Sequence, residues 1–87
     1  MDEFTVYVLR SKKTGRRYIG YTFDIQKRLL EHNDGINRST IAGIPWEVLY
    51  TEAGFKTRKS AQSREKEIKS WKGGVKLRDL LQSAGIV

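Results

Sequence analysis

The sequence of 87 residues contains no cysteine, one histidine and one proline. Without cysteine the chain forms no disulfide framework and offers no thiolate to a metal, and a single histidine then excludes a zinc cluster. No segment approaches the roughly 18 consecutive apolar residues of a membrane span. Residues 1–10 begin with acidic side chains and are apolar too briefly for a signal peptide. We therefore expect a soluble, cytoplasmic protein without a membrane partner, with association with the nucleoid as an alternative.

Two common signatures of catalysis are also missing. Gly73 and Gly74 lack the flanking pattern of a glycine-rich phosphate-binding loop. No Ser-His-Asp arrangement is visible, and one would have to be built around His32. The length predicts one domain over residues 1–87, since domains usually contain about 100 residues or more. With 38% hydrophobic and 31% charged residues, this domain is expected to be globular rather than disordered.

The charge of the chain is strongly positive. The formal net charge is +7, and residues 56–78 contain nine Lys or Arg against two Glu. Such clustering is typical of a surface that faces phosphate groups, and it favours a polyanionic partner. The simpler alternative is a small ribosome-associated protein, or a basic protein whose charges only face solvent.

Hydrophobic periodicity predicts an α+β fold. The alternating segments are typical of strands, and the segments with apolar residues at three- and four-residue spacing are typical of helices. We expect an α/β sandwich in which a three-stranded antiparallel sheet is flanked by helices in the order β-β-α-β-α-α. The expected ranges are strands 4–10, 17–22 and 46–52, helices 24–33, 57–72 and 76–84, and a polar loop over residues 35–45.

The segment RRYIGYT, residues 16–22, is unusual for a strand that only packs, because Gly20 takes the place of a bulky residue. Opposite residues of an antiparallel hairpin share a face. A connecting loop with an even number of residues would put Tyr7 and Tyr18 on one face with Gly20 beside them, whereas an odd number would separate the tyrosines. An aromatic pair that simply packs is one interpretation. The other is that Gly20 leaves room for a phosphate or a metal below the Tyr18 hydroxyl.

Three further residues are candidates for a site. Arg28 and His32 are four residues apart on a predicted helix, so they are neighbours on one face, although a lone histidine there is more often packed or half-exposed, and an arginine is usually a surface residue. Glu65 lies within the apolar stripe of its helix, where an unpaired carboxylate costs several kcal/mol. An internal salt bridge, for example to Arg28 or Arg64, or a bound metal would offset that cost. Glu67 falls on the polar side of the same helix.

These residue types suit phosphodiester chemistry. A carboxylate can bind a hard divalent cation, an arginine can stabilise the charge that develops on the phosphate, and a phenol can orient or deprotonate water. Their arrangement resembles the GIY-YIG endonuclease family, in particular its compact, free-standing single-domain branch. Val6-Tyr7 with Leu9 resembles the first half-motif, in which Thr5 replaces the glycine, and Tyr18-Ile19-Gly20 matches the second letter for letter. Further similar segments are Arg28-Leu29, His32-Asn33 with Gly35, residues 46–52, Ala61, Arg64-Glu65-Lys66, Ile68-Lys69 and Trp71.

The resemblance implies a role for each of these residues. Glu65 would hold a single Mg²⁺ or Mn²⁺, Arg28 would bind the scissile phosphate, and Tyr18 would be the preferred general base. Tyr7 would share that role or position the water and phosphate, and His32 would assist proton transfer. Because a free phenol has a pKa of about 10, a base role needs a nearby cation or metal. Contacts with the nucleic-acid backbone are expected from Arg16, Arg17, Arg58, Lys69 and Lys72.

The sequence departs from the family at three places. No asparagine follows Asn37, so Gln82 or Ser83 would replace the late asparagine of many relatives. Residue 21, often lysine in DNA-repair relatives, is Tyr21, and residues 73–75 interrupt the basic run that follows Trp71.

We therefore expect a divalent-metal-dependent DNA endonuclease that selects structure rather than sequence. A nucleic-acid-binding module that cuts poorly or not at all is the alternative, and RNA is an alternative target.

Overall fold

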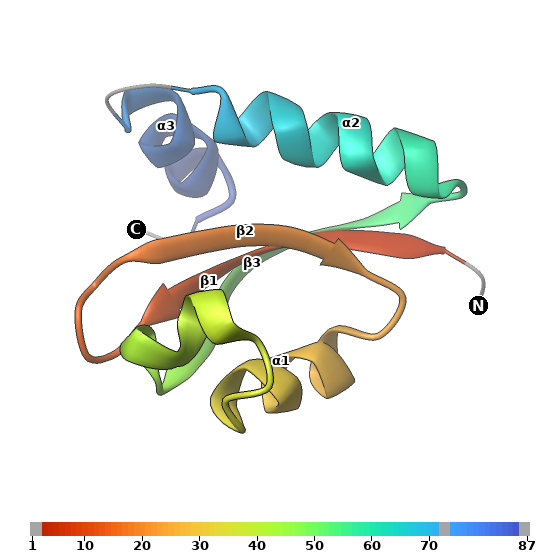
Figure 1. Ribbon diagram of the computed structural model, residues 1–87. Coiled ribbons are helices and arrows are strands. Elements are labelled where there is room, and N and C mark those ends of the chain that lie inside the picture. The colour runs from red at the N-terminus through yellow and green to blue at the C-terminus, as the bar shows by residue number, and fades with distance from the viewer. Residues whose placement is uncertain (1–2, 72–73, 86–87) are drawn as a thin grey trace.

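The computed structural model describes residues 3–71 and 74–85 of the chain. A three-stranded antiparallel sheet with strand order β2-β1-β3 forms the centre of the molecule (Figure 1). The strands are β1 (Phe4–Ser11), β2 (Arg17–Thr22) and β3 (Trp46–Phe55). The predicted α+β class, with strands and helices in the order β-β-α-β-α-α, is confirmed.

Helices cover both faces of this sheet. α2 (Arg58–Lys69) and α3 (Val75–Ser83) lie on one side, and α1 (Ile25–Asn33) lies on the other together with η1 (Arg38–Gly43), a short 3-10 helix (Figure 1). None of the helices within the described residues is long and apolar enough to cross a membrane.

The ends of several elements differ from those predicted. The expected loop over residues 35–45 contains η1, and β3 continues three residues beyond the expected end, because Phe55 pairs with Phe4 of β1. α2 ends at Lys69, whereas residue 72, the predicted end, lies outside the described residues. Side-chain caps mark the starts of two helices: Asp24 accepts a hydrogen bond from the Lys27 amide, and Thr57 from the Ser60 amide.

Each face of the sheet has its own hydrophobic core, because side chains alternate along β1. Val6 and Val8 point toward α2 and α3, where they pack with Ile68 and Leu81. Tyr7 and Leu9 point the other way and pack with Trp46 below α1 and η1. Full burial of one such aliphatic side chain stabilises the fold by about 1.5–3 kcal/mol. The first core holds α2 against the sheet, and the second holds Tyr7 beneath α1.

Contacts from β3 determine the conformation of η1. The indole nitrogen of Trp46 donates a hydrogen bond to the Thr40 carbonyl at 2.7 Å. Gly43 lies so close to the Trp46 ring that a Cβ at this position would overlap the indole. Asn33, at the end of α1, binds both the amide and the carbonyl of Trp46 through its side chain. Together these contacts fix Thr40 next to the last turn of α1.

A separate polar network attaches α2 to β3. The Arg64 guanidinium donates two hydrogen bonds of 2.8 Å to the Glu52 carboxylate, which also accepts one of 2.6 Å from the Tyr50 hydroxyl. The hydrogen bonds from Arg64 lower the pKa of Glu52. Burial, followed by the contact with Glu52, raises the pKa of Tyr50 to about 12. This network holds α2 at a fixed position over the sheet.

Candidate active site

The hairpin register places both tyrosines of the half-motifs on the same face of the sheet. Tyr7 pairs with Gly20, and because side chains alternate, Tyr18 shares the face of Gly20. The two phenol rings lie 6.4 Å apart between centroids. The prediction that Tyr7 and Tyr18 share a face is therefore confirmed, and both rings lie on the side covered by α1.

The structure corrects the expected role of Gly20. A Cβ built on Gly20 would lie 2.5 Å from the Tyr7 hydroxyl oxygen and 2.7 Å from the ring carbon that carries it. The space above Gly20 is therefore filled by the Tyr7 phenol and does not offer room for a phosphate or a metal. Glycine is required here because the Tyr7 side chain lies across β2 on its way to α1.

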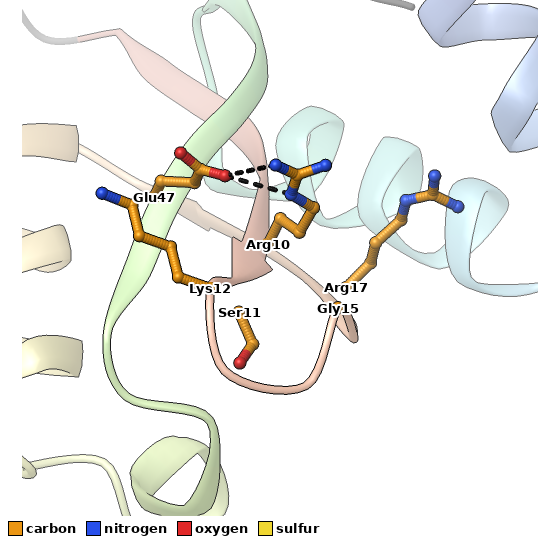
Figure 2. A pocket seen from close by; sticks show the side chains of 6 residues that line it. All are labelled: Arg10, Ser11, Lys12, Gly15, Arg17 and Glu47. Atoms are coloured by element: carbon orange, nitrogen blue, oxygen red, sulfur yellow. Dashed lines mark hydrogen bonds and ion pairs between the residues drawn. The ribbon is translucent and has the colours of Figure 1, made fainter.

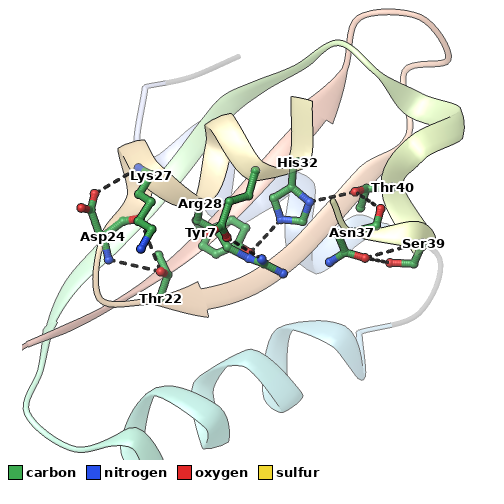
Figure 3. Close-up of polar contacts among 10 residues, drawn as sticks. Tyr7, Thr22, Asp24, Lys27, Arg28, His32, Asn37, Ser39 and Thr40 are labelled. Atoms are coloured by element: carbon green, nitrogen blue, oxygen red, sulfur yellow. Dashed lines mark hydrogen bonds and ion pairs between the residues drawn. The ribbon is translucent and has the colours of Figure 1, made fainter. Parts of the chain in front are cut away.

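A continuous chain of hydrogen bonds leads from Tyr7 to the 3-10 helix (Figure 3). The Tyr7 hydroxyl lies 3.1 Å from Nε2 of His32, and Nδ1 of His32 lies 2.8 Å from Oγ1 of Thr40. The Thr40 hydroxyl donates its proton to the Asn37 carbonyl at 3.1 Å, so its oxygen accepts from His32. Nδ1 therefore carries the imidazole proton, and Nε2 accepts the Tyr7 proton.

Burial sets the protonation of this pair. His32 is fully buried. Burial lowers the pKa of His32, and the neighbouring Arg28 charge lowers it further, so the imidazole is neutral at pH 7. Tyr7 is only 1% exposed, and burial raises its pKa although Arg28 acts in the opposite direction. At neutral pH a protonated phenol thus donates to a neutral imidazole.

Arg28 connects this buried pair with solvent. It lies one turn before His32 on α1, and its side chain lies against the Tyr7 hydroxyl (Figure 3). Its guanidinium forms an ion pair of 2.8 Å with Glu31. Together with Lys27 it lines a groove of about 240 Å³ beside α1. The predicted pair of Arg28 and His32 is therefore brought together with Tyr7, but the histidine points inward and the arginine reaches the surface.

Glu65 lies on α2 and is paired within its own helix. Its carboxylate is 3.0 Å from Nζ of Lys69, one turn later, and its side chain is 15% exposed. Neither Arg28 nor Arg64, the two partners suggested for Glu65 from the sequence, pairs with it within the described residues. Arg28 pairs with Glu31, and Arg64 pairs with Glu52. Lys69 also lies over the Tyr18 ring, 6.0 Å from its centroid. Burial is the main cause that raises the pKa of Tyr7, followed by the Tyr18 phenol, and the negative charge of Glu65 adds a smaller effect in the same direction.

A sequence profile of the GIY-YIG catalytic domain matches residues 3–78 of the chain. The chain belongs to the GIY-YIG family. It therefore falls within a superfamily of nucleases.

The chain is also similar to several individual proteins. A UPF0213 protein of Staphylococcus saprophyticus is 37% identical over 79 residues, which cover 90% of this chain and 94% of that protein. A UPF0213 protein of Bacillus pumilus is 42% identical over 66 residues, which cover 75% of this chain but only 65% of that protein. The solution NMR structure of the UPF0213 protein BH0048 from Bacillus halodurans superposes with a TM-score of 0.55 at 28% identity, covering 97% and 86% of the two chains.

The side chains of this GIY-YIG domain fit a divalent cation only if water and substrate phosphates supply most of its ligands. Within the described residues, no three His, Asp or Glu side chains gather into a metal-binding cluster. Mg²⁺ is often held by one or two carboxylates, with water and substrate phosphates completing its coordination. A single carboxylate, that of Glu65, matches this mode, provided that Lys69 moves aside.

The basic residues expected to contact nucleic acid lie on different parts of the GIY-YIG domain. Arg16 and Arg17 are exposed at the hairpin end, and Figure 2 shows Arg17 at the edge of a hollow of about 430 Å³ with Lys12 and the Arg10–Glu47 ion pair. Arg58 is exposed and lies over the Phe4 ring at 5.4 Å, while Lys69 pairs with Glu65. Lys72 lies outside the described residues.

Sequence reasoning missed Thr40, the partner that orients His32. Thr40 follows His32 by eight residues, in a segment without helical or strand periodicity, so no sequence pattern joins the two. Gln82 and Ser83, the expected substitutes for the late asparagine, are exposed on α3. No hydrogen bond within the described part of the chain joins them to the tyrosines.

Proposed function

We propose that this protein is a divalent-metal-dependent endonuclease that hydrolyses DNA phosphodiester bonds, with residues 1–87 acting as one nuclease domain. The observation that carries the proposal is the hydrogen-bond chain from Tyr7 through His32 to Thr40, which lies beside Arg28. A buried phenol and imidazole need hydrogen-bond partners in any fold, so the bonds themselves also serve packing. This chain of hydrogen bonds supports proton transfer because the acceptor nitrogen of His32 is unprotonated and points at the Tyr7 hydroxyl, next to the cation Arg28.

Arg28 is the proposed phosphate ligand. Its guanidinium reaches the groove beside α1 while it also lies against the Tyr7 hydroxyl. A phosphate bound there would replace Glu31 as its partner, since guanidinium binds phosphate and carboxylate oxygens in the same fork geometry. The bound phosphate would then lie next to the phenol that handles the proton.

Tyr7 is the proposed general base, in place of Tyr18. A phenol that takes a proton from water must pass its own proton on, and Nε2 of His32, 3.1 Å away, is the acceptor available to Tyr7. Tyr18 is more exposed and lies below Lys69, which suits it to hold the water in place. Thr40 keeps the acceptor nitrogen of His32 directed at Tyr7.

Glu65 is the proposed metal ligand. A bound Mg²⁺ or Mn²⁺ would supply positive charge at the scissile phosphate and lower the pKa of bound water. The chain contributes the carboxylate and an ammonium, Lys69, that balances its charge while no metal is present. Mn²⁺ binding followed by electron paramagnetic resonance tests this role without any cleavage: Glu65→Ala should lose most of the bound Mn²⁺, and the exposed neighbour change Glu67→Ala should keep it.

DNA is the proposed substrate, with RNA as the alternative nucleic acid. The net charge of +7 and the exposed arginines of the hairpin predict that affinity falls steeply as salt rises. An affinity that stays flat with salt would contradict a polyanionic partner. We propose a preference for branches, flaps or single strands over particular base sequences.

The experiment that tests the activity compares variants on plasmid and branched DNA in the presence of Mg²⁺ or Mn²⁺. Glu65→Ala and Arg28→Ala should abolish nicking, and Tyr7→Phe should reduce it more than Tyr18→Phe. Glu67→Ala is the matched control and should cut like the wild type. If the wild-type protein binds DNA but does not nick it, the chain is a binding module on the GIY-YIG fold.

A further inference from the structure

Phe23, between β2 and α1, carries a large exposed aromatic ring that the proposed chemistry does not use. It is 56% exposed although it follows a strand of the central sheet directly. One face of its ring stacks on Phe4, with 4.0 Å between centroids and 26° between planes. Phe4 is itself buried and contacts the edge of Tyr21. Phe23 is thus supported by the Phe4 ring, while more than half of its surface is exposed to solvent.

The groove next to this ring leads to the proposed phosphate ligand. The groove is lined by residues from the end of β2 to the second turn of α1: Thr22, Phe23, Asp24, Lys27, Arg28 and Glu31. Both carboxylates in the groove are engaged: Asp24 accepts the Lys27 amide at the start of α1, and Glu31 pairs with Arg28. The volume of about 240 Å³ is below the roughly 300 Å³ at which pockets for drug-sized ligands begin. The groove suits a smaller, flat group that is attached to an anion.

We propose that Phe23, with Lys27 and Arg28, forms a subsite that stacks an unpaired DNA base next to the phosphate bound by Arg28. Single-stranded nucleic acid is typically held by aromatic rings that stack bases and by cations that follow the backbone. Here the ring is held in place by Phe4 and lies next to two cations in the same groove. A base in a duplex is stacked on its neighbours, so the subsite selects single strands, flaps and branch points.

This subsite rests on the proposed nuclease function, since Arg28 is its phosphate ligand. Its test is therefore a binding measurement in the Glu65→Gln background, which prevents cleavage. The probe is a short single-stranded DNA that carries the fluorescent base 2-aminopurine, whose emission falls when it stacks on an aromatic ring. A blunt duplex of the same sequence is the control probe, because it has no unpaired base and binds only through its backbone.

Phe23→Leu keeps an apolar contact with Phe4 but removes the ring. It should weaken single-strand binding by roughly fivefold to a hundredfold, the value of one base–aromatic stack, and abolish the 2-aminopurine quenching. Duplex binding should not change. Phe23→Tyr restores a ring and should restore both signals, which separates loss of stacking from loss of folding. Val75→Ala removes a similarly exposed apolar side chain from α3 and is the matched control.

Two results would overturn the subsite: equal single-strand affinity with leucine or phenylalanine at position 23, or an equal loss on single strand and duplex. If the wild-type protein nicks DNA while Phe23→Leu leaves single-strand affinity unchanged, the subsite fails and the nuclease proposal stands. If Phe23→Leu loses single-strand affinity although the wild-type protein never cuts, the subsite stands and the nuclease proposal fails.

Discussion

Gly20→Ala tests whether the Tyr7 phenol lies across β2 as described. The added Cβ would lie 2.5 Å from the Tyr7 hydroxyl oxygen, about 1 Å closer than an unstrained contact. The ring must move, and its hydrogen bond of 3.1 Å to His32 is lost with that movement. Overpacking of this kind costs about 1–3 kcal/mol. Since a loss of 1 kcal/mol lowers the melting temperature of a domain of this size by roughly 4–8 °C, the melting temperature of Gly20→Ala should be about 5–20 °C lower than that of the wild type.

A double-mutant cycle isolates the cause of this loss. The backbone at Gly20 does not have a positive φ, so alanine itself is not strained there. In a Tyr7→Ala background the overlap no longer exists, and Gly20→Ala should become neutral or stabilise the strand by about 0.5–1 kcal/mol. Thermal unfolding of the four proteins by circular dichroism measures the coupling. An unchanged melting temperature for Gly20→Ala alone, or the same loss in both backgrounds, would refute the packing of Tyr7 over Gly20.

Two further predictions concern charge and pH. Burial lowers the pKa of His32, so below about pH 6.5 the folded state binds fewer protons than the unfolded state. The free energy of unfolding should therefore fall by up to about 1.4 kcal/mol per pH unit below that value. Urea unfolding between pH 5 and 7 measures this, and the free energy of unfolding of His32→Gln should depend less on pH than that of the wild type. The lowered pKa of Glu52 also makes stability fall as the pH falls, chiefly near and below its ordinary value of 4.5, and this effect is common to the wild type and His32→Gln. Arg64→Met leaves the Glu52 carboxylate without its cation and should lower the free energy of unfolding by about 1–3 kcal/mol, as measured in urea. Arg10→Met breaks the more exposed pair with Glu47 and should lower it by about 1 kcal/mol or less. Equal losses for the two arginine variants would argue against a structural role for the Arg64 network.

Local patterns predicted the elements of this fold well. Alternation of apolar residues located the three strands, and apolar residues at three- and four-residue spacing located the helices. The common face of Tyr7 and Tyr18 also followed from strand geometry once the register was assumed. The ion pair between Glu65 and Lys69 joins residues at the i,i+4 spacing that favours such pairs, so the sequence contained the signal that identifies this partner.

Other features depend on contacts between distant segments and had no local signal. η1 is held by the Trp46 indole, by the Asn33 side chain at Trp46 and by the absence of a side chain on Gly43. The orientation of His32 follows from Thr40, whose position is set by η1. The role of Gly20 could not be read from the strand because the Tyr7 side chain, which fills that space, comes from the neighbouring strand.

In the proposed site, α1 and the hairpin bind the phosphate and transfer the proton, and α2 binds the metal. These elements lie on opposite faces of the sheet, so the two functions meet only at the site around Tyr7 and Tyr18. Substitutions in the network of Arg64 and Glu52, which attaches α2 to β3, should therefore lower cleavage by displacing Glu65 while DNA affinity is kept.

The most direct test of the central claim is the rate of strand cleavage on a flapped DNA with Mn²⁺ under single-turnover conditions. The wild-type protein and Glu67→Ala should cut at the same rate, and Glu65→Ala and His32→Gln should each be strongly slowed while they still bind the DNA. Cleavage by Glu65→Ala at the wild-type rate in a preparation free of contaminating nuclease would contradict the account.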